Sequence, residues 1–262
     1  MRHANIEGLP SSVLGRVMTL LTSFTVPDSE LTLTELAQRS RIPKPTAHRL
    51  VAEMVEWQVL ERTADGGIRL GILLFELGQL APRQRSLRET AQPFLSDLHR
   101  ATGLTAHLGL LDGESVVYLD KISASSGPAL PSRIGGRMPL YCTAIGKALL
   151  AFAGEELIGR VVRGELRRRT PHTIAMPRLL LRQLDQVRET GVAFEKEEST
   201  LGVVCVASPA FGRDGRPAGA LSISGWSSRV DIAKAAPAVR TAALALSREL
   251  GATDRSTCRD PS

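Results

Sequence analysis

The sequence predicts two domains: an N-terminal winged helix-turn-helix, mostly α, and a C-terminal α+β domain with an antiparallel sheet. Its 262 residues exceed what one ordinary core organises. Three helical patterns and one hairpin pattern fill about the first seventy residues. From Leu87 onward, helices accompany short strands that turn at Asp-Gly pairs. Strands joined by tight turns pair antiparallel, and helices then cover the sheet.

The first two helices follow from apolar spacing and a capping motif. SSVLGRVMTLL places apolar residues at i, i+3, i+4 and i+7, and the residues expected inward are Leu14, Val17, Met18 and Leu21. Thr32 and Glu35 form a T-x-x-E capping box, which opens a second, short helix that ends after Arg39. Its inward residues are expected to be Leu33, Leu36 and Ala37.

A third helix and a hairpin complete the first domain. The helix begins in RIPKP, where Pro45 suits the first turn. Its apolar stripe is Ala47, Leu50, Val51, Met54 and Val55. VLERTADGGIRLG then predicts two short strands around Asp65-Gly66-Gly67.

The chain divides at a linker. LLFELGQLA predicts a helix, and the polar, basic PRQRS is expected to connect the domains. The predicted divisions are 1–71 for the helix-turn-helix, 72–86 for the linker helix and connection, 87–252 for the second domain and 253–262 for a disordered tail.

The second domain is predicted to open with a helix whose inward residues are Ala91, Phe94, Leu95 and Leu98. Strands at 105–111 and 115–122 turn at Asp112-Gly113. One helix starts near Thr143 and another ends at Gly191. Strands near 192–197, 202–208 and 217–224 follow, the last two turning at Asp214-Gly215, and a helix at about 230–250 ends the fold.

Composition narrows the class of protein only in part. The formal charge is +6, but residues 1–71 hold eight basic and eight acidic side chains. The net charge of this region therefore does not indicate DNA binding, and only the positions of individual cations can. Three widely spaced cysteines fit a reducing cytosol, and no His/Cys spacing indicates a metal site. No apolar run reaches membrane length, and the N-terminus lacks a signal-peptide core. We expect a soluble, cytoplasmic protein without membrane contact, metal or cofactor.

The third helix carries the candidate DNA contacts. Four cations and His48 stand between Arg39 and Arg49 with no acid among them. The second helix of a helix-turn-helix meets base edges with its N-terminal residues. Arg49 suits a bidentate contact to guanine, while Arg41, Lys44 and Thr46 suit phosphates. The candidate DNA-binding residues are Arg41, Lys44, Pro45, Thr46, His48 and Arg49; the alternative is an ordinary solvated helix face.

GRMPLYCTAIGKALLA contains a Gly-Lys pair but does not match a phosphate loop. Tyr141 and Ala148 occupy the places where that motif needs Gly and Ser or Thr. The loop can instead feed a helix N-terminus whose free N–H groups, from Thr143 to Gly146, hold an anionic ligand group. Simple capping by Thr143 is the alternative.

A second polar cluster lies in the last strands. Ser222 and Ser224 are two apart and project from one face, near a strand that carries Cys205, with Glu195 close by. They could line a small polar pocket, or be ordinary serines on a half-exposed strand. A nucleophilic role for Cys205 lacks a visible base. The basic run RGELRRRT, 163–170, is expected to be a solvated surface.

These stretches give the chain a resemblance to the IclR family of bacterial transcription regulators over residues 11 to 251. The matching segments are LTLTELAQRSRIPKPTAHRLV with its wing, GRMPLYCTAIGKALLA, and EKEESTLGVVCVASPAF followed by SIS. The resemblance implies a dimerising linker helix and a GAF-like α+β effector-binding domain. It also implies that small organic acids or aromatic compounds modulate binding to double-stranded operator DNA. The family's effector pocket falls here on Ala144, Ile145, Glu195, Cys205, Ser222 and Ser224.

The sequence departs from the family pattern at the pocket and beside the recognition helix. The family usually has a smaller residue at Ile145 and often Asp at Glu195, which bears on pocket volume and polarity. Gln58 stands where the family commonly has a glycine after the recognition helix, and Trp57 beside it is unusual. Both residues bear on the orientation of the wing relative to that helix.

Three hypotheses follow. The leading one is a ligand-responsive, DNA-binding regulator that works as a homodimer or homotetramer and has no catalytic residues. Its rival is a thiol-dependent enzyme or reactive-thiol sensor built around Cys205 or Cys142. The third is a regulator that binds no small-molecule effector and whose DNA binding changes only through oligomerisation.

Overall fold

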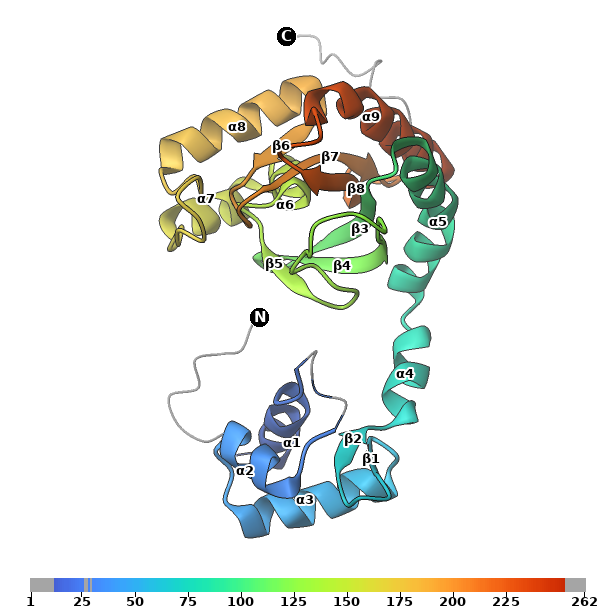
Figure 1. Cartoon of the computed structure of the whole chain (residues 1–262), viewed down its shortest axis with the longest axis vertical. Helices are drawn as coiled ribbons and strands as arrows, with labels where there is room; N and C mark the ends of the chain where they lie inside the picture. The colour runs from blue at the N-terminus through green and yellow to red at the C-terminus, as the bar shows by residue number, and fades with distance from the viewer. Residues whose placement is uncertain (1–11, 26–27, 29, 253–262) are drawn as a thin grey trace. The chain divides into compact units, whose positions relative to one another are not determined.

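The computed structural model describes residues 12–25, 28 and 30–252, and divides into two compact units, Met1–Arg85 and Ser86–Ser262 (Figure 1). The tail predicted to be disordered, 253–262, lies outside the described residues. Within the described residues, no helix is long and apolar enough to cross a bilayer.

The first unit has the predicted three helices and hairpin. Its elements are α1 (Val13–Thr22), α2 (Leu33–Ser40), α3 (Lys44–Glu56), β1 (Leu60–Arg62), β2 (Ile68–Leu70) and α4 (Ile72–Gln79). The capping box is present, since the Glu35 carboxylate accepts the Thr32 N–H at 2.8 Å and the Thr32 hydroxyl accepts the Glu35 N–H at 3.2 Å. Gly66 turns the hairpin with φ of 79°. The predicted winged helix-turn-helix is confirmed.

The inward face predicted for α1 is wrong in part. Leu14 and Met18 are 70% and 50% exposed, whereas Leu20 is fully buried. Val17 and Leu21 pack against the same core, together with Phe24 just after the helix. The buried face is therefore rotated by about 60° from the predicted stripe, at 3.6 residues per turn. The apolar spacing alone could not choose between these two overlapping faces.

The stripe predicted for α3 is confirmed, with Ala47, Leu50, Val51 and Met54 buried and Val55 packed against the core. After this helix Gln58 adopts a left-handed conformation with φ of 56°. A side chain there costs about 1–2 kcal/mol, which explains why glycine suits this position. The Gln58 and Val59 N–H groups still cap α3 through the carbonyls of Val55 and Met54. The chain therefore enters the wing in a regular helix-ending turn despite the missing glycine.

The second unit is an α+β structure around one antiparallel sheet. Its helices are α5 (Pro82–Thr102), α6 (Ala144–Leu150), α7 (Glu155–Arg163), α8 (Pro177–Thr190) and α9 (Ile232–Glu249). Its strands are β3 (Thr105–Asp112), β4 (Ser115–Ile122), β5 (Arg137–Pro139), β6 (Ala193–Lys196), β7 (Val203–Phe211) and β8 (Pro217–Trp226). The sheet order is β5-β4-β3-β8-β7-β6, and every pairing is antiparallel. The predicted fold class is confirmed.

Three details of the second unit differ from the prediction. PRQRS, expected to connect the domains, is helical as the start of α5, because nothing in it breaks a helix after Pro82, and the division between the two units falls within it, after Arg85. Strand β5 was missed because three residues that include Pro139 carry no alternation. Helix α7 was missed because its buried residues, Ile158 and Val161, stand among charged ones.

The two faces of the sheet carry separate cores. Helices α6, α7 and α8 cover one face, and α5 and α9 cover the other (Figure 1). Successive residues of β8 alternate between the faces: Leu221 and Ile223 pack toward α5 and α9. Ser222 and Ser224 therefore point toward the side of α6.

Candidate functional site

Strand register gathers polar side chains on the α6 side of the sheet. Glu195 lies opposite Cys205, Cys205 opposite Ser224, and Ser224 opposite Thr105 across β6, β7, β8 and β3. In the adjacent row His107 lies opposite Ser222, which lies opposite Ala207. Residues directly opposite in antiparallel strands share a face. The two rows make a polar floor from four strands.

A cavity of about 30 Å³ lies over this floor. Its wall contains all six residues proposed from the resemblance, Ala144, Ile145, Glu195, Cys205, Ser222 and Ser224. It also contains residues that the sequence did not single out, His107, Tyr118 and Ser132 among them. Since one water needs about 10–15 Å³ of such space, the cavity has room for about two.

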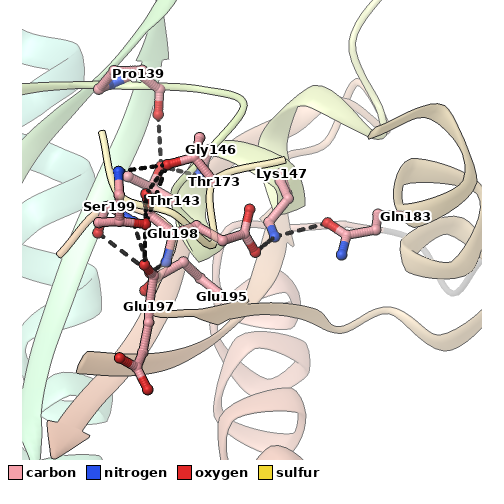
Figure 2. A network of polar contacts seen from close by, with 11 residues as sticks. Pro139, Thr143, Gly146, Lys147, Thr173, Gln183, Glu195, Glu197, Glu198 and Ser199 are labelled. Carbon is pink, nitrogen blue, oxygen red and sulfur yellow. Dashed lines mark hydrogen bonds and ion pairs between the residues drawn. The ribbon is translucent and has the colours of Figure 1, made fainter. Parts of the chain in front are cut away.

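Glu195 is fully buried in this wall. Its Oε1 accepts the backbone N–H groups of Glu198 at 2.7 Å and Ser199 at 3.0 Å (Figure 2). Within the described residues no N–H or O–H group bonds to its Oε2, and the Cys205 thiol, opposite it on β7, contacts the carboxyl group. Burial raises the pKa of Glu195, which favours the neutral acid. In that form Oε2 can donate a hydrogen bond to a ligand instead of repelling an anion.

Packing and a buried ion pair account for the Gly146-Lys147 sequence, which therefore needs no phosphate-binding role. The Lys147 side chain is buried, and its Nζ lies 2.6 Å from Glu198 Oε1 and 2.8 Å from Gln183 Oε1 (Figure 2). A β-carbon on Gly146 would lie 2.3 Å from the Leu140 carbonyl oxygen, so only glycine fits there. Both residues anchor α6 to its neighbours.

The prediction of free N–H groups from Thr143 to Gly146 is wrong at Gly146. The Thr143 hydroxyl accepts the Gly146 N–H at 3.1 Å and donates to the Pro139 carbonyl at 2.8 Å (Figure 2). Thr143 is thus the N-cap of α6, as the alternative interpretation held. Ala144 and Ile145 line the cavity immediately after this cap.

Ile145 is accommodated by a glycine in the sheet. A β-carbon on Gly109 would lie 3.0 Å from Ile145 Cγ2 and 2.8 Å from Val116 Cγ1. Gly109 also sits at a register shift in the β3–β4 pairing. The larger residue at 145 therefore occupies space that the missing side chain leaves over β3.

Neither candidate cysteine is set up as a nucleophile. Cys205 Sγ lies 2.9 Å from Ser224 Oγ, and burial raises the pKa of its thiol. Burial likewise raises the pKa of Cys142 to about 12. His107 lines the same cavity, but burial lowers its pKa to about 3. Both thiols therefore stay protonated at neutral pH, where the thiol and not the reactive thiolate is present.

The candidate DNA-contact residues gather around the turn between α2 and α3. Arg41, Lys44, Pro45, His48 and Arg49 are exposed, and Thr46 is half-buried. Arg49 pairs with Glu53 at 2.8 Å and Lys44 donates to the Thr34 hydroxyl at 3.0 Å; both contacts are exposed. Arg39 differs, because it binds Asp28 at 2.6 Å. Arg41 and Lys44 thus carry the local excess of cations at the start of α3, while Arg49, farther along the helix, is paired with Glu53.

The basic segment 163–170 is exposed except for Leu166, which is half-buried, and Thr170, which is buried. The Thr170 hydroxyl donates to the Glu197 carbonyl at 2.6 Å, and the Thr173 hydroxyl donates to the Glu198 carbonyl at 2.6 Å. The segment therefore combines a solvated surface with an anchor for the turn that holds Glu195.

Comparison with known proteins agrees with both units. The IclR helix-turn-helix domain matches residues 13–64, and the bacterial transcriptional regulator IclR C-terminal domain matches residues 80–248. The chain is 37% identical to the HTH-type transcriptional regulator XynR of Escherichia coli (strain K12) over 241 residues, 90% of this chain and 96% of that protein. It is 30% identical to the transcriptional repressor IclR of the same organism over 221 residues, covering 83% and 81%.

Solved structures show the same fold. An IclR homolog from Microbacterium hydrocarbonoxydans, complexed with 4-hydroxybenzoate, aligns with a TM-score of 0.87 at 29% identity, over 91% of this chain and 99% of that one. The Thermotoga maritima IclR aligns with a TM-score of 0.75 at 31% identity, over 90% and 97%. The relatives are named as regulators, which gives the thiol-enzyme alternative no support. The family matches, the relatives and the solved structures together show that the chain belongs to the IclR family of bacterial transcriptional regulators.

Proposed function

We propose that this regulator binds its operator through the exposed start of α3, and that a small organic acid bound in the cavity changes its operator affinity. The cavity supports the effector half of this proposal, because Glu195 Oε2 is buried beside the hydroxyls of Ser222 and Ser224 and has no hydrogen-bond partner in the part of the chain that the structure describes. Hydroxyls and a neutral carboxyl group can all donate to a carboxylate. The 4-hydroxybenzoate bound to the Microbacterium hydrocarbonoxydans homolog supports an acid of this class.

An organic acid needs more room than the cavity offers as it stands, since about two waters fill it. The segment 123–136, between β4 and β5, supplies Leu130, Pro131 and Ser132 to the wall. It is tied down by Lys121 Nζ on the Ser132 carbonyl and by the Trp226 indole on the Ser126 carbonyl. Ligand entry is therefore accompanied by a shift of this segment.

Operator affinity measured by fluorescence anisotropy, with and without a panel of small organic acids, tests the proposal. The panel includes 4-hydroxybenzoate, benzoate, 4-hydroxybutyrate and butyrate. A working effector is expected to change the affinity of the protein for its operator by about 5- to 150-fold. By linkage, bound operator DNA changes the affinity of the protein for the effector by the same factor. If no acid gives calorimetric heat or alters operator binding, the regulator does not work through acids.

Arg49→Ala is expected to lower specific operator affinity by more than about 1 kcal/mol, the low end of a bidentate base contact. The fold should remain, because the substitution removes only an exposed pair with Glu53, worth about 0.3–0.5 kcal/mol. Anisotropy at one stated salt concentration measures the loss. Equal affinity of variant and parent for the operator would rule out the α3 assignment.

Lys44→Ala should weaken specific and random DNA alike, since a phosphate contact carries no sequence information. The slope of log affinity against log salt should fall by about 0.9 for each protomer on the DNA, the value for one phosphate contact on duplex DNA, and so by about 1.8 for a dimer. Titrations at several salt concentrations give this slope directly. An unchanged slope would remove Lys44 from the phosphate contacts.

We also propose that the chain is a dimer, or a pair of dimers, held partly through α4. Phe75 and Leu77 on this helix, and Leu80 after it, are 62%, 55% and 72% exposed. A dimer that reads successive half-sites needs its recognition helices about 34 Å apart or a multiple of it. Sedimentation should show no monomer at working concentration, and Phe75→Glu should shift the distribution toward monomer. A monomeric parent protein would contradict the proposal.

A further inference from the structure

His107 forms a polar part of the cavity wall that neither the sequence nor the family resemblance assigned. It lies on β3 opposite Ser222, is 2% exposed and lines the cavity. Its ring stands edge-on to Tyr118, with centroids 5.3 Å apart. Its Nε2 lies 2.8 Å from Ser132 Oγ, on the segment that covers the cavity.

The other ring nitrogen of His107 is unused. Within the described residues Nδ1 is buried and has no hydrogen-bond partner. Leaving a buried polar group unpaired is unfavourable, so such a group is a place where a bound molecule gains affinity. A neutral imidazole offers one donor and one acceptor, and Ser132 takes only one of them.

The protonation state of His107 determines which kind of ligand group it can bind. Burial, and then the charge of Lys121, lower the pKa of His107 to about 3, so the ring is uncharged at neutral pH. Lys121 itself donates to the Ser132 carbonyl at 2.8 Å and is not part of the cavity wall. The uncharged ring can accept from or donate to a group that carries no charge, such as a hydroxyl, at its free nitrogen.

Glu195 and His107 stand at opposite sides of the polar floor. They lie on β6 and β3, which are three strand spacings apart, or about 14 Å between backbones. The side chains between them on β7 and β8 are short, namely Cys205, Ala207, Ser222 and Ser224. The floor therefore has a longer polar side chain at each side and short side chains between them.

We propose that His107 is an effector-binding residue, and that the effector is an acid with a second, uncharged hydrogen-bonding group, such as a hydroxyl, held at His107. This inference rests on the proposed function, because it assumes that an acid occupies the cavity. It adds that the carboxylate lies toward Ser222, Ser224 and Glu195, and that the remote hydroxyl decides specificity.

Calorimetric titration with matched probes tests it: 4-hydroxybenzoate against benzoate, and 4-hydroxybutyrate against butyrate. The parent protein is expected to bind the hydroxylated member of at least one pair about tenfold more tightly, the factor for one hydrogen bond of about 1.4 kcal/mol. In His107→Phe, which keeps an aromatic ring beside Tyr118, this ratio should fall to near one, while affinity for the plain acid changes less than about threefold. His107→Gln, which keeps a donor and an acceptor, should retain part of the ratio.

The possible results separate the two proposals. If an acid binds but both members of its pair weaken equally in His107→Phe, or if the plain acid binds more tightly to the parent, His107 is not the specificity residue and the proposed function stands. If no probe binds the parent protein, the proposed function and this inference both fail. Thermal unfolding of each variant shows whether a lost ratio reflects the contact or the fold. Should His107→Phe not fold, the ratio in His107→Gln decides, and an unchanged ratio there overturns the inference.

Discussion

Lys147→Met is expected to lower the free energy of unfolding of the second unit by about 3–5 kcal/mol, the usual cost of breaking a buried ion pair. Lys147 and Glu198 have 1% and 4% of their side-chain surface exposed, and their charged atoms are 2.6 Å apart. Without Lys147 the Glu198 carboxylate stays buried with no cation, and its Oε2 already lacks a partner within the described residues. Methionine keeps the volume, so the loss comes from charge.

Urea denaturation followed by tryptophan fluorescence measures this loss. The chain has two tryptophans, and Trp57→Phe leaves Trp226 on β8 as the only reporter, which lies in the second unit. Lys234→Met is the matched control, because its pair with Asp231 at 3.6 Å is exposed and should change stability by less than about 0.5 kcal/mol. Adding Glu198→Gln to Lys147→Met should recover part of the loss. Equal stability of the two methionine variants would show that the buried pair contributes nothing.

Removing both floor hydroxyls with Ser222→Ala and Ser224→Ala is expected to abolish the response to an organic acid, while ligand-free operator binding stays nearly unchanged. Both side chains face the cavity, and Ser224 Oγ also lies 2.9 Å from Cys205 Sγ. A carboxylate that loses two hydroxyl donors loses about 1.5–3 kcal/mol for each hydrogen bond to a charged group. The summed loss exceeds a hundredfold in affinity.

Operator titrations at increasing acid concentration show the effect. Ser208→Ala is the control, because Ser208 is equally buried on β7 but donates to the Gly191 carbonyl at 2.8 Å and does not line the cavity. It should cost about 1 kcal/mol of stability and keep the acid response. A double variant that still responds at parental acid concentrations would place the effector site elsewhere.

Local patterns predicted the parts of the fold that local interactions determine. The Thr32–Glu35 capping box, the α3 stripe and the turns at Gly66, Gly113 and Gly215 each depend on a few neighbouring residues. The buried face of α1 was predicted wrongly because it depends on where α2 and α3 lie. Strand β5 exists only through its pairing with β4.

The same distinction applies to the site. Ser222 and Ser224 were found because they share a strand, Cys205 and Glu195 because they lie in the neighbouring strands, and Ala144 and Ile145 came as pocket residues from the resemblance. His107 was missed because only the β3–β8 register brings it beside Ser222. Lys147 was noticed as half of a Gly-Lys pair, but its partner Glu198 lies 51 positions away in the chain. No spacing rule within a sequence predicts a contact of that kind.

The packing of Ile145 over Gly109 sets a constraint on how this regulator and its relatives can diverge. A side chain at position 109 meets Ile145 and Val116 at once, so the two cavity-side positions 109 and 145 cannot both enlarge. Shrinking residue 145 relieves one of the two contacts, but a side chain at position 109 still meets Val116 Cγ1 at 2.8 Å, so both neighbours must give way before the glycine can be replaced. We therefore expect substitutions at 145 and 116 to precede those at 109 in evolutionary time, with the shape of the effector cavity changing when residue 145 does.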